Sequence, residues 1–163
     1  MRHEPEIGIA TEQDLDALTG LMAAFRDHLG QPEPPDHALR ASLAYLLTDK
    51  DTEFLVVRSQ GEALLGYAQL RYRYSAWVSG LEAHLEDLYI VLPARGLRVG
   101  TRLLRGALAR AAHRGARMVG LNTNERNAMA VGLYRRAGFV CERGRWEGGR
   151  QLWFEKPLEG TTS

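Results

Sequence analysis

Hydrophobic and polar residues follow two different periods along this chain. Three stretches repeat their apolar residues every three or four positions, as amphipathic helices do. The first of these predicted helices begins after Thr11, the second begins after Asp36, and the third spans Val99–His113. Short β-branched or alternating runs, typical of strands, lie between them. The predicted strands are Glu6–Ala10, Glu53–Arg58, Ala63–Tyr74, Leu81–Val91 and Arg117–Asn122.

The C-terminal part continues the alternation of helices and strands. A helix is predicted over Ala128–Ala137, followed by strands at Phe139–Arg143 and Gln151–Lys156. Gly115 and Gly138 stand where left-handed caps end the two later helices. Consecutive hairpins followed by β-α-β alternation predict an α/β fold. We expect a mixed, mostly antiparallel sheet of six to seven strands with helices on both faces, in a single domain over residues 1–163.

Composition narrows the classes of protein. The 163 residues are 45% hydrophobic and carry 21 Lys plus Arg against 20 Asp plus Glu, so a nucleic-acid partner is not expected. Arginines crowd 95–117 and 135–150, either as solvated helix faces or as a positive rim around a phosphate-rich ligand. No apolar run reaches the ~20 residues of a membrane span, and no signal-peptide core precedes the first strand. We expect a cytoplasmic protein without a membrane partner.

Cysteine and histidine offer no separate chemistry. Cys141 is the one cysteine of the chain, and its predicted strand setting favours a packed thiol. The five histidines lack the spacing of metal ligands, so no metal is expected.

The loop Arg95–Thr101 is the first candidate binding element. It follows an apolar strand and opens a helix, where unpaired N–H groups and a partial positive charge attract anions. It lacks the Gly-Lys-Ser/Thr of a P-loop and the three glycines of a dinucleotide fingerprint. The loop is therefore either an ordinary turn between strand and helix or a phosphate cradle of another kind.

A second motif favours the cradle. The helix segment Asn127-x-x-Ala130-x-x-Leu133-Tyr134-x-x-x-Gly138-Phe139 resembles the late helix of the GCN5-related N-acetyltransferase (GNAT) family. The loop resembles the pyrophosphate loop of that family, Arg/Gln-x-x-Gly-x-Gly/Ala, through Arg95 and Gly100. It departs at the middle glycine, which is Arg98 here. That arginine would either narrow the cradle or reach a CoA phosphate.

The resemblance implies acetyl-CoA as co-substrate and assigns residues to it. Backbone groups of Leu88, Tyr89 and Ile90 would pair with the pantetheine arm, and Asn127 would contact the arm near the thioester, with Ala130 beside it in the motif. The remaining cofactor residues are those of the loop: Arg95, Gly96, Leu97, Arg98, Val99, Gly100 and Thr101.

Tyr134 is the predicted general acid. Asn127 and Tyr134 are seven residues apart, so on a helix they share a face about 10.5 Å apart along the axis. A phenol with a pKa near ~10 can protonate a departing thiolate. The alternative is a packed tyrosine whose hydroxyl finds a partner in the protein.

Glu86 is the predicted base. If Leu81–Val91 is a regular strand, Glu82, His84 and Glu86 share a face with Leu88 and Ile90. The segment Leu85–Ile90 also resembles the matching strand of diamine and polyamine acetyltransferases, in which a glutamate assists deprotonation of the amine. Two alternatives stay open: Glu86 pairs with an arginine, or a bulge shifts the register and makes Asp87 an acceptor.

These residues predict an enzyme that acetylates a primary amine of a diamine-like or polyamine-like small molecule, or of a peptide. The amine would attack directly in a ternary complex, because no activated nucleophile is visible. Arg98 motivates the alternative, a non-catalytic acyl-CoA sensor. The aromatic set Tyr72, Tyr74 and Trp77 is either core or an aromatic wall for an ammonium group, with core packing favoured. The predicted edge strand near Gln151 makes a homodimer plausible.

Overall fold

The structure is a computed structural model that describes residues 4–141 and 152–158. Contacts divide the chain into two compact units, residues 1–124 and 125–163. The first unit holds one sheet whose strands follow the order of the chain. The strands are β1 (Glu6–Ile9), β2 (Thr52–Arg58), β3 (Leu64–Ser75), β4 (Gly80–Ile90) and β5 (Met118–Leu121). The first four are antiparallel, and β5 runs parallel to β4.

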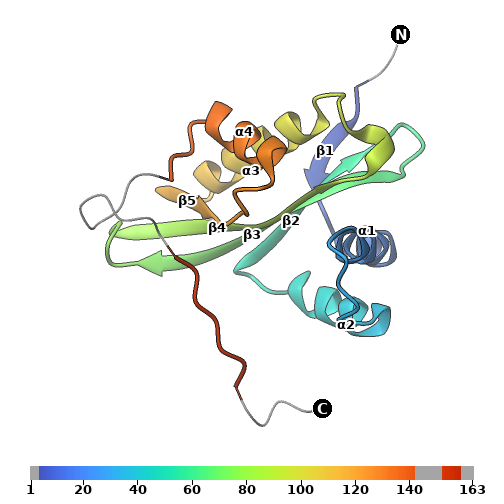
Figure 1. Ribbon diagram of the computed structural model, residues 1–163, viewed down its shortest axis with the longest axis horizontal. Helices are drawn as coiled ribbons and strands as arrows, with labels where there is room; N and C mark the ends of the chain where they lie inside the picture. Colours follow the sequence, from blue (N-terminus) through green and yellow to red (C-terminus); the bar gives the residue numbers. More distant parts are fainter. Residues whose placement is uncertain (1–3, 142–151, 159–163) are drawn as a thin grey trace. The chain divides into compact units, whose positions relative to one another are not determined.

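Helices cover both faces of this sheet (Figure 1). α1 (Leu15–His28) and α2 (Asp36–Leu46) pack on one face, and α3 (Val99–His113) packs on the other. The short 3-10 helices η1 (Glu12–Asp14) and η2 (Leu92–Ala94) precede α1 and α3. The expected mixed sheet with helices on both faces is confirmed.

β2 shows how the two cores are separated. Its residues 54–57 are all buried, which is the pattern of a strand covered on both faces. Phe54 and Val56 belong to the core that α1 and α2 complete. Because side chains alternate along a strand, Leu55 and Val57 point to the α3 side. There they meet the buried face of α3, which consists of Val99, Leu103, Leu104, Ala107 and Ala111.

The expected strand number is wrong for the described part of the chain, which has five strands rather than six to seven. Neither Phe139–Cys141 nor Leu152–Lys156 forms a strand. The remainder of those two predicted strands lies in 142–151, outside the described residues. Short apolar runs extend as strands only where a neighbouring strand accepts their hydrogen bonds, and local patterning does not show whether one does.

The second unit contains α4 (Ala128–Arg136). Asn127 caps this helix: its side-chain oxygen accepts a hydrogen bond from the Ala130 N–H at 3.2 Å. Gly138 follows the helix with φ of 92°, a left-handed conformation that glycine adopts without strain. The predicted helix and its end are confirmed.

Candidate active site

The edge of β4 that faces β5 is paired only as far as Leu85. β5 pairs with β4 only from Glu82 to Leu85, so no strand of the described part of the chain pairs with this edge of β4 at Leu88–Ile90. Val91 donates its N–H to the Leu65 carbonyl of β3 at 2.9 Å. Backbone groups alternate sides along an antiparallel strand, so those of Tyr89 also face β3. Those of Leu88 and Ile90 face the open edge.

This register corrects one expectation. Tyr89 cannot offer its main chain to a pantetheine arm, because β3 already uses that side of the strand. Leu88 and Ile90 keep the expected orientation. The Tyr89 side chain is buried and stacks on Phe25 of α1, with ring centroids 5.1 Å apart. Tyr89 therefore helps to fix α1 on the sheet.

The loop that follows β4 presents a run of unpaired N–H groups. Gly96 and Arg98 have φ of 81° and 60°, and α3 begins directly after Arg98. Among the hydrogen bonds of the described residues, none uses an N–H of residues 96 to 101 as donor, and the first amide of this region with an acceptor is that of Arg102. Six consecutive free donors at the positive end of a 15-residue helix have the arrangement that the phosphate-cradle prediction requires.

Arg95 attaches the loop to β4. Its Nε donates to the Ile90 carbonyl at 2.9 Å, and its guanidinium lies 5.6 Å from the centre of the Tyr89 ring. Its side chain thus reaches back to the strand. Arg98 is exposed and occupies the left-handed position where the family pattern has glycine. A non-glycine residue in that conformation is strained, which marks the loop as tightly specified.

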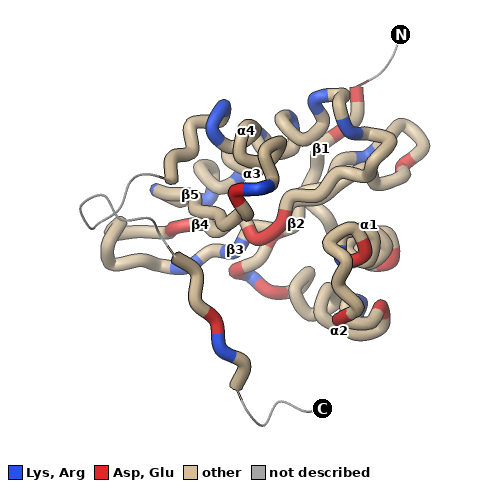
Figure 2. Tube along the Cα trace, in the orientation of Figure 1, with Lys and Arg blue, Asp and Glu red and all other residues tan. Residues whose placement is uncertain are grey.

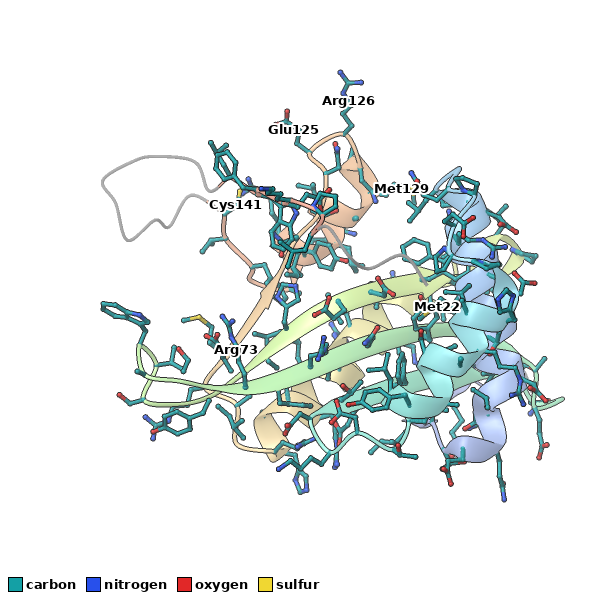
Figure 3. All side chains as sticks on the ribbon, turned by 90° about the horizontal axis from the view of Figure 1, so that it is seen from below. Met22, Arg73, Glu125, Arg126, Met129 and Cys141 are labelled. Atoms are coloured by element: carbon teal, nitrogen blue, oxygen red, sulfur yellow. The ribbon has the colours of Figure 1, made fainter. Side chains whose placement is uncertain are left out.

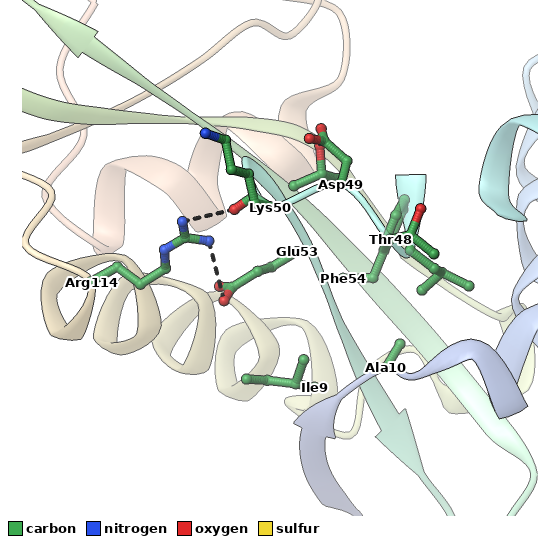
Figure 4. A pocket seen from close by; sticks show the side chains of 10 residues that line it. Ile9, Ala10, Thr48, Asp49, Lys50, Glu53, Phe54 and Arg114 are labelled. Carbon is green, nitrogen blue, oxygen red and sulfur yellow. Dashed lines mark hydrogen bonds and ion pairs between the residues drawn. The ribbon is translucent and has the colours of Figure 1, made fainter. Parts of the chain in front are cut away.

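Most arginines of α3 serve the fold. Arg110 and Arg114 bind Glu53 of β2. Arg114 also donates to the Lys50 carbonyl, and Figure 4 shows both contacts of Arg114. Arg102 donates to the Pro5 carbonyl. Basic positions are spread along α3, and acidic positions occur on β4 (Figure 2). Three arginines of the positive rim considered from the sequence therefore attach α3 to the strands and to the segment before β2.

A bulge in β4 rearranges the acidic residues. Asp87 pairs with Gln69 and Leu85 pairs with the next residue of β3, so Glu86 has no partner in the register. This one-residue insertion moves Asp87 onto the face that carries Glu82 and His84. The expectation that Leu88 and Ile90 share that face is wrong, and the bulge with its shifted register is confirmed. The role of Asp87 as an acceptor stays a prediction.

The three acidic side chains of β4 have different surroundings. Glu82 forms an ion pair with Arg73, the β3 residue labelled in Figure 3. Glu86 is exposed and makes no hydrogen bond or ion pair within the described residues, so the expected alternative of an arginine partner is not found. Asp87 is half-buried and accepts a hydrogen bond from the Tyr67 hydroxyl at 3.0 Å.

Burial governs the acidity of Asp87. It raises the pKa of this carboxyl above its ordinary value, the Tyr67 hydrogen bond opposes that change, and the negative charge of Glu86 adds to it. A carboxylate with a raised pKa is a stronger base than one in water. Tyr67 and Phe25 were not predicted as part of this region, because their partners are distant in sequence. The aromatic residue at Tyr67 in a buried strand was the one available signal.

The three aromatic residues Tyr72, Tyr74 and Trp77 differ in burial. Tyr72 is buried, donates its hydroxyl to Glu53 at 3.0 Å and lies under the Arg114 guanidinium at 4.0 Å, so core packing is confirmed for it. Tyr74 and Trp77 are exposed near the β3–β4 turn, against the expectation of core packing. His84 is half-buried, as expected of a strand residue.

The residues predicted to meet the thioester lie in the second unit. Tyr134 is on α4, and its ring packs edge-on against Phe139 at 5.9 Å between centroids. The side-chain oxygen of Asn127 is occupied by its cap to Ala130. Glu86 belongs to the first unit, so the meeting of Tyr134 with the β4 carboxylates stays a prediction. Cys141 is exposed, which corrects the expected packed thiol.

A cavity of about 300 Å³ lies elsewhere, lined by the end of β1, the segment between α2 and β2, the start of β2, and Arg114 just after α3 (Figure 4). None of the residues predicted for acetyl-CoA lines it. Within the described residues no group of three or more His, Cys, Asp or Glu side chains could hold a metal ion. The described helices also include none that is long and apolar enough to cross a membrane.

Comparison with known proteins identifies the class. Residues 18–139 match the family model described as "Acetyltransferase (GNAT) family", and the match crosses both compact units. A solved structure of AAC(6')-Iy in complex with the bisubstrate analog CoA-S-monomethyl-acetylneamine covers 96% of this chain and 100% of that one. The TM-score is 0.77 at 17% identity, which shows a shared fold.

Two relatives share more sequence. Thialysine N-epsilon-acetyltransferase of Mus musculus is 32% identical over 80 residues, which are 49% of this chain and 46% of the relative. The chain thus matches about half the length of that protein. Aminoalkylphosphonate N-acetyltransferase of Salmonella typhimurium is 26% identical, covering 82% of this chain and 84% of the relative. The chain belongs to the acetyltransferase (GNAT) family.

Proposed function

We propose that the protein transfers an acetyl group from acetyl-CoA to a primary amine of a small cationic molecule, such as a diamine or polyamine, or of a peptide. The observation that carries this proposal is the run of six unpaired N–H groups at residues 96 to 101, directly after the open edge of β4. The family match supports it.

These elements fit the two chemically distinct parts of CoA. The free amides of the loop and the N-terminal end of α3 suit the pyrophosphate, which carries negative charge and only acceptor oxygens. The backbone of Leu88 and Ile90 suits the amides of the pantetheine arm, which can add to a sheet edge as a strand does. Arg95 keeps the two elements together.

The proton transfers are assigned to side chains of both units. At neutral pH an alkyl amine with a pKa near ~10 arrives protonated, so a base must remove one proton before the nitrogen can attack. We assign that step to the acidic pair Glu86 and Asp87. Tyr134 then donates its phenolic proton to the departing sulfur, and Asn127 lies about two turns before it on the same face of the helix. No acyl-enzyme is needed, because the amine attacks the thioester carbonyl directly.

Two observations favour a cationic amine. Glu86 and Asp87 lie side by side at the bulge of β4 without an arginine or lysine partner in the described residues. The names of both relatives given above describe N-acetyltransferases, whose acceptors are amines. A peptide amine fits the same chemistry, and the choice between the two belongs to experiment.

The test is release of CoA from acetyl-CoA in the presence of polyamines, amino acids, aminoglycosides and peptide amines. We expect turnover with at least one of them, and loss of roughly 10²–10⁴ in kcat for Tyr134→Phe. Tyr45→Phe, an exposed tyrosine on α2, is the matched control and should retain the rate. Absence of turnover on the whole panel would remove the proposal.

Arg98 favours a second candidate, an acyl-CoA sensor, because its side chain stands where the family loop has glycine. Calorimetry separates the two functions. A sensor binds CoA tightly without turnover, and Tyr134→Phe leaves its affinity unchanged. The transferase binds CoA and also releases it from acetyl-CoA when the amine is added.

Self-association is a further proposal. Leu152, Trp153 and Phe154 expose apolar side chains near the C-terminus. Exposed apolar residues favour an interface with a second copy of the chain. Light scattering during size exclusion should then give twice the chain mass, and replacement of Trp153 and Phe154 by serine should restore the mass of one chain.

A further inference from the structure

Tyr67 is fully buried, and its hydroxyl oxygen is the one polar atom of its side chain. Its ring packs between Phe54 and Tyr89, with centroids 6.3 and 6.5 Å away. Its hydroxyl donates to Oδ2 of Asp87 at 3.0 Å. A buried hydroxyl without an acceptor is destabilising, so the core fixes both the ring and the direction of this hydrogen bond.

The bulge at Glu86 makes this contact possible. Tyr67 pairs with Tyr89 and Gln69 pairs with Asp87, so the two partners lie on the same face of adjacent strands. Without the extra residue, Asp87 would point to the α3 face and away from the tyrosine. The bulge and the hydroxyl therefore act together on one carboxylate, whose Oδ1 has no partner within the described residues.

We propose that Tyr67 is a positioning residue that holds Asp87 as the proton acceptor for the incoming amine, while the exposed Glu86 attracts the cation. This inference rests on the transferase function proposed above. In the step, one N–H bond of the ammonium group breaks and an O–H bond forms at Oδ1 of Asp87. The nitrogen keeps the electron pair with which it attacks the thioester.

The charged and titratable groups around Asp87 are compatible with this role. On β4 these are Glu86, His84 and Tyr89, and on β3 Tyr67 and Arg71. His28 of α1 and Arg95 of the loop both contact the Tyr89 ring on this side. Burial and Glu86 make the carboxylate more basic, and the Tyr67 hydroxyl limits that effect while it fixes the geometry.

Replacement of the hydroxyl tests the inference. In Tyr67→Phe the hydrogen bond that favours the charged carboxylate is lost, so the acidic limb of the kcat/KM profile should move to higher pH. Incorporation of difluorotyrosine at position 67 gives a more acidic donor and should move the limb the other way. Tyr72→Phe, which removes a buried hydroxyl that binds Glu53, should leave the profile unchanged.

A second readout does not depend on turnover. Carboxyl carbon NMR of the enzyme labelled with ¹³C-aspartate, with the Asp87 signal assigned through Asp87→Asn, should show Asp87 titrating at higher pH in Tyr67→Phe than in the wild type. An acidic limb and an Asp87 titration that both stay in place would overturn the inference, even if the enzyme is active. If the wild type shows no turnover, the proposed function fails while the NMR titration still tests the pairing.

Discussion

Arg110 of α3 holds Glu53 of β2 through two nitrogens, with Nε 3.0 Å from Oε2 and Nη2 2.6 Å from Oε1. The Glu53 side chain is only 11% exposed, and Tyr72 and Arg114 complete its surroundings. This ion pair joins α3 to β2 through two residues that are 57 positions apart in the sequence. The helix that begins with the candidate anion loop is thereby fixed to the sheet at its other end.

Removal of the Glu53 charge should lower stability. In Glu53→Gln two arginines and the Tyr72 hydroxyl lose a charged acceptor, and we expect the free energy of unfolding to fall by about 2–3 kcal/mol. Denaturant-induced unfolding measures this free energy. Asp16→Asn, which removes an exposed ion pair with Arg40, should change stability by less than ~0.5 kcal/mol. Equal losses in the two variants would contradict this account.

Acid should weaken the same attachment. Burial opposes ionisation of Glu53, but hydrogen bonds from Arg110 and Tyr72 outweigh it and hold the pKa of this carboxyl below its ordinary value. A group with a lowered pKa contributes stability above its unfolded pKa and loses that contribution as pH falls through the folded one. The difference in unfolding free energy between wild type and Glu53→Gln should therefore shrink from about pH 7 to about pH 3. A constant difference would exclude ionisation as the cause.

Gly66 of β3 should not tolerate a side chain. A Cβ at this position would lie 2.6 Å from the Tyr89 carbonyl oxygen, which is backbone and cannot move without disturbing β4. We expect Gly66→Ala to cost about 1–3 kcal/mol. Gly20 of α1 has open space around it, so Gly20→Ala should stabilise the protein by about 0.5–1 kcal/mol through helix propensity. Thermal unfolding should give a lower melting temperature for Gly66→Ala and a higher one for Gly20→Ala than for the wild type.

Arg95 should affect CoA binding through the loop. Lysine cannot reproduce both the Nε hydrogen bond to Ile90 and the planar contact with Tyr89. We expect Arg95→Lys to weaken CoA binding roughly tenfold, which corresponds to ~1.4 kcal/mol. Calorimetry gives the affinity. Arg105→Lys on the exposed side of α3 is the control and should stay within roughly twofold, whereas an unchanged affinity in Arg95→Lys would leave this arginine without a role in the loop.

Local elements were predictable because their causes are local. Apolar spacing over Val99–His113 gave the bounds of α3, and Gly115 ends it with φ of 89°. The Asn127–Phe139 motif indicated the family that the chain belongs to. Tyr67 and Glu53 were missed, since their significance arises only from partners 20 and 57 residues away.

The sequence by itself determined the succession of helices and strands, the glycine-bearing loop and the acidic segment of β4. Periodicity and backbone preference act within a few residues, so they can be read along a chain. Tertiary structure decided which carboxylate lies on which face. Because Glu86 has no partner on β3, each later side chain of β4 lies on the face opposite to the one that strict alternation predicts. This bulge is defined by the pairing of β4 with β3, so the sequence of β4 alone does not reveal it.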